Sequence, residues 1–232
     1  MNKKNKLNHL LQLCQFSDSA LPIGSFAFSN GLESAIQLKV VTDDKSLKNY
    51  IMVCLTKNAS LDGVYINHAY QAAKKRNIQS LIEIENSYRT KIIGKEQQLM
   101  TSRVGQKFAT LFLKIHDSEL LNEFLYLHKN NKDNLSHAII HSIICSELSL
   151  SQEETFALYH YGIASMILSA AVRLMRIDHY QTQRILFEVN KKVDEFYAES
   201  RRLTLDETHS FSPMFDCLVA HHVDAHVRMF MN

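Results

Sequence analysis

The chain has 232 residues, of which only two are Pro, six are Gly and none is Trp. Hydrophobic residues make up 46% and charged residues 22% of the chain, which excludes a disordered or collagen-like protein. Pro and Gly, the residues that break helices, fall far below their average shares of roughly 5% and 7%. A β-sandwich or a Gly-rich nucleotide-binding fold needs more turn residues than this, so we expect an all-α protein.

The formal net charge of +2 predicts no long-range attraction to nucleic acid or to a membrane surface. The four Cys residues are scattered without a CxxC spacing, which favours free thiols over a disulfide framework. The N-terminal lysines precede no long apolar region, so we expect no signal peptide. The longest run of apolar and small residues, 162–172, is shorter than the ~20 residues of a membrane-spanning helix. We therefore expect a cytoplasmic protein that binds neither nucleic acid nor a membrane.

In the first half of the chain, apolar residues recur at helical spacing in several segments. We expect helices over 8–16, over 30–38 after a capping box at Asn30 and Glu33, from Thr42 and Asp43 onward, over 61–73, over 78–84 and over 96–115. Between them, 18–28 is predicted to be a structured turn and 86–95 to be irregular.

The second half begins with a polar stretch at 129–134, which predicts a surface loop. We expect helices over 135–147, from a capping box at Ser151 and Glu154 to residue 173, over 180–203, and from Ser212-Pro213 to residue 227. The helix after Ser151 is apolar over most of its girth, which is typical of a helix at the centre of a bundle. Since the sequence shows no repeat or linker, we expect one domain over 1–232, a helical bundle of about nine helices.

Histidines on two predicted helices are candidate metal ligands. They are His137, His141, His221, His222 and His226, and the acid Asp224 lies beside the last three. Two imidazoles at i,i+4 lie on the same helix face and can chelate a metal, but a third ligand has to come from elsewhere. No HExxH motif supplies a general base. We favour the alternative, hydrogen-bonded histidines on ordinary helices, and predict that the chain itself holds no metal and no cofactor.

Signatures of an activated nucleophile or a phosphate-binding loop are absent from the sequence: it has no GxSxG, Walker A or GxGxxG motif. The acid pairs Glu153-Glu154 and Asp43-Asp44 stand at helix starts, where acids stabilise the helix dipole. The sequence therefore predicts a protein that is not an enzyme. A helical, His-containing metal-dependent hydrolase and a generic helical protein-interaction module stay open as alternatives.

The segment 16–33 contains a residue that restricts the backbone dihedral angles close to one that permits unusual angles. Pro22 restricts the backbone and Gly24 frees it, which builds a specific turn. One interpretation is a structural corner held in place by Phe26 and Phe28. The other is a recognition surface that the turn keeps rigid.

This segment resembles the N-terminal signature of the UreF family of urease accessory proteins, in which Pro-x-Gly precedes an aromatic, a Ser and Gly-Leu-Glu. The matching residues are Pro22, Gly24, Phe26, Ser29, Gly31, Leu32 and Glu33. The family's C-terminal pattern is similar at His222, Arg228, Met229 and Phe230, and its central helix at Glu96, Gly105 and Phe108. The similarity runs in the same order over nearly the whole chain.

The chain also departs from the family pattern. Val223 follows His222, Asn232 ends the chain, Gln98 and Lys107 stand where Arg is common, Phe28 stands where many members have His or another aromatic, and 176–183 lack the usual Pro and Gly. These departures concern charged contacts to partners and the surface near residue 177, and leave the expected fold unchanged.

The resemblance implies an all-α scaffold without catalysis of its own. It implies binding to a UreD/UreH-type accessory protein and recruitment of the nickel-carrying UreG-type GTPase, whose GTP hydrolysis the scaffold modulates. It also implies a homodimer, and delivery of nickel to apo-urease.

The resemblance further assigns candidate site residues. For the UreD/UreH-type partner they are Arg228, Met229, Phe230 and His222; for partner binding or a structural turn, Pro22, Gly24, Ser25, Phe26, Ser29, Gly31 and Glu33; for the GTPase or the dimer, Glu96, Arg103, Gly105 and Lys107. We expect the apolar tail 228–232 to be disordered alone and ordered on partner binding. Docking of Phe230 onto its own domain is the alternative.

Overall fold

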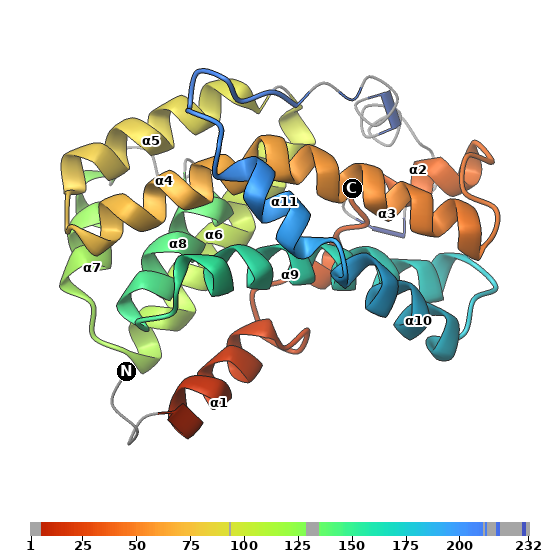
Figure 1. Ribbon diagram of the computed structural model, residues 1–232, viewed down its shortest axis with the longest axis horizontal. Helices are drawn as coiled ribbons and strands as arrows, with labels where there is room; N and C mark the ends of the chain where they lie inside the picture. Colours follow the sequence, from red (N-terminus) through yellow and green to blue (C-terminus); the bar gives the residue numbers. More distant parts are fainter. Residues whose placement is uncertain are drawn as a thin grey trace.

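The computed structural model describes residues 6–92, 94–128, 135–210, 212, 217–218 and 229–230, without the side chain of Glu96. Over these residues the chain forms eleven α-helices, one short 3₁₀ helix and no strand, so the all-α prediction is confirmed (Figure 1). In chain order the elements are α1 (Lys6–Ser17), the 3₁₀ helix η2 (Ser25–Ala27), α2 (Leu32–Gln37), α3 (Asp44–Ser60), α4 (Asp62–Lys74), α5 (Ile78–Lys91), α6 (Lys95–Ile115), α7 (Glu119–Leu127), α8 (His137–Glu147), α9 (Gln152–Leu174), α10 (His179–Asn190) and α11 (Val193–Ser200).

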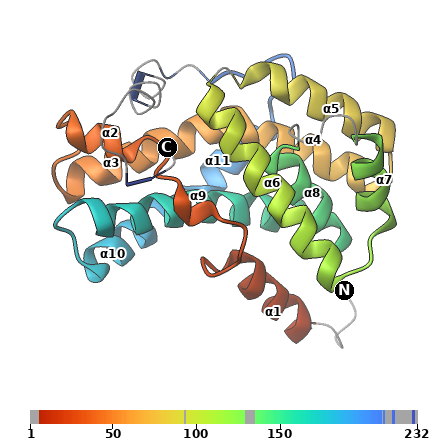
Figure 2. The ribbon, with the colours of Figure 1, turned by 180° about the vertical axis from the view of Figure 1, so that it is seen from behind.

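The bundle is organised around α9, which contacts α1, α2, α3, α4, α8, α10 and α11. On one side of it, α4 to α8 form one hydrophobic cluster, and on the other, α2, α3, α10 and α11 form a second (Figures 1 and 2). Tyr159 of α9 belongs to the first cluster and Phe156 to the second, while Ile163 packs against both. The two halves therefore share one central helix.

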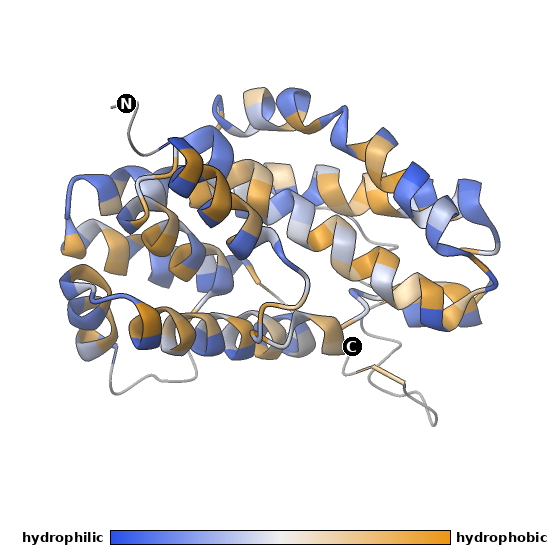
Figure 3. Ribbon diagram, turned by 90° about the horizontal axis from the view of Figure 1, so that it is seen from below, coloured by the Kyte–Doolittle hydropathy of each residue, from blue (hydrophilic) through white to orange (hydrophobic). Residues whose placement is uncertain are grey.

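Most helices alternate short apolar and polar stretches, as expected of helices that bury one face (Figure 3). α9 is the one helix in the described part of the chain that is long and apolar enough to cross a membrane, by length and composition only. Half of its most apolar window is buried inside the bundle, and a central core helix meets the same criterion.

Side-chain caps begin several helices where the sequence predicts them. The Asp43 carboxylate accepts a hydrogen bond from Ser46 N at 2.8 Å, and the Ser151 hydroxyl accepts one from Glu154 N at 3.2 Å. The box predicted at Asn30 and Glu33 is wrong, because α2 begins one residue later and its N-cap is Gly31, with φ of 78°. A glycine has no side chain with which to cap, and Glu33 contacts a distant segment instead, as described below.

The eleven helices exceed the nine expected, and two boundaries differ for tertiary reasons. α5 runs to Lys91 through the segment predicted to be irregular, because buried Tyr88 donates a hydrogen bond to Asp62 Oδ1 at 2.7 Å. The single helix predicted over 180–203 is interrupted at Lys191 and Lys192, so that α11 packs onto α4, where Asn67 Nδ2 donates to Ser200 Oγ.

The sequence analysis assigned no helix to α7, which Ser118 caps by accepting a hydrogen bond from Leu121 N. The loop predicted at 129–134 lies outside the described residues. So does most of the last predicted helix, of which Cys217 and Leu218 are described and are helical.

Candidate functional site

The N-terminal corner, residues 18–33, is a series of tight turns. Asp18 accepts hydrogen bonds from Ala20 N on its carboxylate and from Leu21 N on its carbonyl. Gly24 has a φ of 80°, in the left-handed region that a residue without Cβ adopts at little cost. Before α2 the backbone is left-handed again at Asn30 and Gly31, with φ of 54° and 78°. These turns fix the direction in which the corner side chains point.

The corner is half structural and half exposed. Phe28, Ser29 and Asn30 are buried, and Tyr50 OH donates a hydrogen bond to the Asn30 carbonyl at 2.7 Å. Phe26, in contrast, is 58% exposed, and Pro22 is exposed too. Of the two rings expected to hold the corner, Phe28 does so, whereas Phe26 leaves most of its surface open to solvent.

Helix α6 touches the corner through Lys107. A Cβ built on Gly24 would lie 2.7 Å from Lys107 Nζ, so the lysine head packs directly over the glycine. Two residues that the sequence assigned to different surfaces therefore meet, while Arg103 is exposed elsewhere on the same helix. Gly105 is buried, and a Cβ there would lie 2.7 Å from the Leu135 carbonyl oxygen, so this residue serves packing.

Residues 229–230 lie against the corner. Met229 N and Phe230 N donate hydrogen bonds to the two carboxylate oxygens of Glu33, at 2.8 and 3.1 Å. Glu33 is only 4% exposed, so these two hydrogen bonds are shielded from water. A residue at the start of α2 therefore holds a residue from the other end of the chain.

Arg173 of α9 completes this contact. Its guanidinium lies 4.3 Å from the centre of the Phe230 ring, and its Nη2 donates a hydrogen bond to the Phe26 carbonyl at 3.0 Å. Phe230 is 5% exposed and belongs to the second hydrophobic cluster, whereas Met229 is 63% exposed. Phe230 thus docks on its own domain, the alternative weighed from the sequence.

Two of the predicted tail contacts, Arg228 and His222, lie outside the described residues, as does the side chain of Glu96. Ordering of 228–232 by a partner stays a prediction. We refer to Phe26, Glu33, Arg173, Met229 and Phe230 as the tail–corner site.

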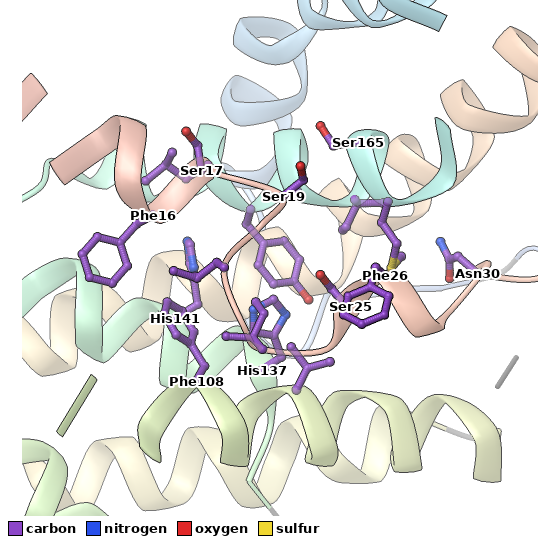
Figure 4. A pocket seen from close by; sticks show the side chains of 18 of the residues that line it. Phe16, Ser17, Ser19, Ser25, Phe26, Asn30, Phe108, His137, His141 and Ser165 are labelled. Carbon is purple, nitrogen blue, oxygen red and sulfur yellow. The ribbon is translucent and has the colours of Figure 1, made fainter. Parts of the chain in front are cut away.

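A cavity of about 120 Å³ lies beneath the corner, between the corner segment, α6, α8 and α9 (Figure 4). Its lining includes Phe16, Ser25, Phe108, His137 and Tyr159. Its lining also contains two further titratable groups, Asp62 and His141.

Burial keeps the two cavity histidines neutral. It lowers the pKa of His137 to about 3 and that of His141 to about 4. His141 Nε2 lies 2.9 Å from the Thr155 carbonyl, to which a neutral ring donates its proton. Within the described part of the chain no group of three or more His, Cys, Asp and Glu could hold a metal, so this pair has no third ligand there. His221, His222 and His226 lie outside it.

Cys145 lies next to His141 but is not activated as a nucleophile. Cys145 Sγ lies 3.6 Å from His141 Nε2, but burial raises the pKa of the thiol to about 12. Since the thiolate is the reactive form and His141 stays neutral, the two do not form a thiolate–imidazolium pair.

Two carboxyls inside the bundle, Asp62 and Glu85, accept hydrogen bonds from distant residues, and the sequence analysis missed them. Asp62 accepts hydrogen bonds from Tyr88 OH and Tyr159 OH at 2.7 and 3.3 Å, and burial raises its pKa. Burial also raises the pKa of both tyrosines well above 10, so their hydroxyls remain donors. Glu85 accepts hydrogen bonds from Ser136 N and Oγ. No local sequence pattern indicates these pairs, because their members are far apart in the chain.

The described residues define an all-helical protein with neutral buried histidines and with a corner of tight turns against which Met229 and Phe230 lie. The UreF family model matches residues 41–190. A protein of Yersinia enterocolitica serotype O:8 (strain NCTC 13174 / 8081) named "Urease accessory protein UreF" is 35% identical over 223 residues, covering 96% of this chain and 98% of the relative. Proteins of the same name from Yersinia pseudotuberculosis serotype I (strain IP32953) and Yersinia pestis (strain Pestoides F) are 34% identical over the same shares.

This chain belongs to the UreF family. The family is by name an accessory one and not a family of enzymes, in agreement with the sequence prediction.

Proposed function

We propose that this chain is a scaffold for urease maturation. It links a UreD/UreH-type accessory protein and a UreG-type GTPase to apo-urease during assembly of the nickel centre, and it modulates GTP hydrolysis by that GTPase. The observation that carries the proposal is the 35% identity over 96% of the chain to a protein named for this accessory role. The neutral buried histidines and the Cys145 thiol are consistent with it, because a scaffold needs no activated nucleophile.

The tail–corner site is the proposed contact for the UreD/UreH-type partner. Phe26 and Met229 are exposed, and Arg173 contacts both the Phe26 carbonyl and the Phe230 ring, so the two exposed side chains belong to one surface. Aromatic residues, Met and Arg are enriched at interfaces, which suits such a surface. Arg228 and His222 are proposed to extend it.

The exposed residues of α6 are the proposed contacts for the GTPase or for a second copy of the chain. Arg103 and Lys107 are exposed on this helix, and Glu96 is proposed to join them. The four cysteines are free thiols, which supports the proposed cytoplasmic location. Neither nucleic acid nor a membrane is part of the proposal.

The test is co-elution of purified proteins in size-exclusion chromatography. The UreD/UreH-type partner is mixed with the full chain, with a chain that lacks 228–232, and with a Phe26→Ala variant. We expect the full chain to co-elute with the partner and the shortened chain to elute alone, because a buried interface anchor contributes about 2 kcal/mol or more to binding. Circular dichroism checks that the shortened chain keeps its helix content.

Two results would overturn parts of this proposal. If the full chain does not bind the partner, the scaffold assignment is wrong. If the shortened chain binds as tightly as the full chain, the partner uses another surface. A loss of helix content on shortening would make the tail structural, and the Phe26→Ala variant then decides whether the corner takes part in binding.

A further inference from the structure

α10 carries two large aromatic side chains on the face opposite its buried one. Tyr180 is 84% exposed and Phe187 is 65% exposed. The helix buries one face through Thr182, Ile185, Leu186 and Val189. At 3.6 residues per turn, positions seven apart differ in direction by only about 20°. Both rings therefore point to solvent along one line of the helix, where polar residues are the usual occupants.

Two cations lie on the same line. Arg184 is exposed between the two rings and makes no hydrogen bond or ion pair with another described residue. Lys191 follows the helix, with its Nζ 4.7 Å from the centre of the Phe187 ring. We call Tyr180, Arg184, Phe187 and Lys191 the α10 face.

The charge of this face is not balanced locally. Glu188 lies beside it and forms ion pairs with two lysines. Its carboxylate lies 2.7 Å from Lys191 Nζ and 4.0 Å from Lys48 Nζ of α3. One carboxylate thus meets two lysines, and the guanidinium of Arg184 remains as additional positive charge. An incoming carboxylate would find a bidentate donor that pairs with no other described residue and that is flanked by two aromatic rings.

We propose that the α10 face docks an acidic segment of a partner protein. Carboxylates of that segment pair with Arg184 and Lys191, and its apolar side chains cover Tyr180 and Phe187. Exposed Tyr, Phe and Arg together have the composition of interface anchors, and charge complementarity selects an acidic partner. A nucleic acid fits less well, because the chain has a net charge of only +2.

The α10 face shares no residue with the tail–corner site, and α10 lies at one end of the bundle (Figures 1 and 2). The inference adds a second docking surface to the scaffold, and it rests on the proposed function for the identity of the proteins to be tested.

The experiment measures binding of three purified proteins to the immobilised full chain: the UreD/UreH-type partner, the UreG-type GTPase and apo-urease. Two variants alter the α10 face, Arg184→Glu and the double change Tyr180→Ala with Phe187→Ala. We expect both to raise the Kd for one of the three proteins by about tenfold or more and to leave the others unchanged. The effect of Arg184→Glu should shrink as salt is raised, because salt screens exposed charges.

Matched controls carry the same kinds of change on another part of the surface. Tyr126→Ala removes an exposed ring on α7, and Lys74→Glu reverses an exposed charge on α4. We expect these variants to bind all three proteins within about twofold of the wild type, within the range usual for residues outside an interface.

Each outcome decides the proposal. If the wild type binds its partners and both α10 variants bind them equally well, the inference is wrong while the proposed function stands. If the wild type binds none of the three, the proposed function fails and the inference with it. If a single-stranded 20-nucleotide DNA binds the wild type but not the Arg184→Glu chain, the face recognises nucleic acid and the acidic-segment proposal is overturned.

Discussion

Glu85 is the clearest example of a buried ionisable side chain whose environment sets its charge. Its carboxyl is fully buried and accepts hydrogen bonds from Ser136 N at 3.1 Å and Ser136 Oγ at 2.6 Å, at the start of α8. These donors favour the charged form, but burial outweighs them and raises the pKa of Glu85 from 4.5 to about 7. Below that pH the folded protein therefore keeps the carboxyl neutral.

This shift makes stability depend on pH in a definite direction. Between pH 4.5 and 7 the folded protein binds more protons at Glu85 than the unfolded chain, so the free energy of unfolding falls as pH rises. The loss is at most about 3.5 kcal/mol, at about 1.4 kcal/mol per pKa unit. In Glu85→Gln, which stays neutral and keeps an acceptor oxygen, this loss should be absent. Urea unfolding of both proteins at pH 5 and pH 8 measures it.

The buried histidines do not obscure that comparison. Burial lowers the pKa of His137, His141 and His160 to between about 3 and 4, so their contribution to stability is lost as pH falls below 6.5. They titrate alike in both proteins and cancel in the difference. Parallel pH profiles of the wild type and Glu85→Gln would show that Glu85 titrates normally in the folded state.

Glu33 shows why part of the site could not be predicted from sequence. The local pattern indicated a cap for α2, whereas the carboxylate binds backbone amides 196 and 197 residues further along the chain. The resemblance selected Glu33 and Phe230 as site residues, but nothing in their spacing indicates that they touch. Arg173, which contacts both the corner and the tail, was not selected at all.

Helix ends that are set by residues close together in the sequence were predicted well. The caps at Asp43 and Ser151 involve side chains three residues apart, so the sequence alone indicates them. The break between α10 and α11 has no such signal, because Lys191 and Lys192 are neither Pro nor Gly. The extension of α5 depends on Tyr88 reaching Asp62 on another helix, a contact that only the folded chain contains.

The two glycines inside long helices give a prediction about helix packing. A Cβ at Gly105 of α6 would lie 2.7 Å from the Leu135 carbonyl oxygen and 3.0 Å from His137 N, and neither backbone atom can move freely. Gly105→Ala should therefore destabilise the protein by about 1–3 kcal/mol, the usual range for overpacking. The change in the free energy of unfolding in urea measures this cost.

Gly162 of α9 is the matched control, because a Cβ there would meet nothing within 4 Å. Gly162→Ala should stabilise the protein by up to about 1 kcal/mol through helix propensity alone. If both substitutions changed stability in the same direction, close contact between α6 and the start of α8 would not be what requires glycine at position 105.

At the scale of the whole molecule, the fold brings residues 229–230 onto the same surface as the corner, segments that are far apart in the sequence. The corner comes from 18–33, the tail from 229–230, and α9 supplies Arg173 between them. A partner that contacts the exposed Phe26 and Met229 would therefore bind the corner and residues 229–230 at the same time. In this account the protein acts by holding other macromolecules in position, with the tail–corner site and the α10 face as separate docking surfaces.

The measurement that tests this account most directly is the nickel content of urease purified from cells grown in limiting nickel. The cells lack the gene for this protein and are supplied with the full chain, with the chain lacking 228–232, or with no copy. We predict that the full chain restores both nickel and activity to urease, and that the shortened chain restores neither although it is folded and present at the same level. Urease that is fully loaded with nickel in cells without any copy would contradict the account.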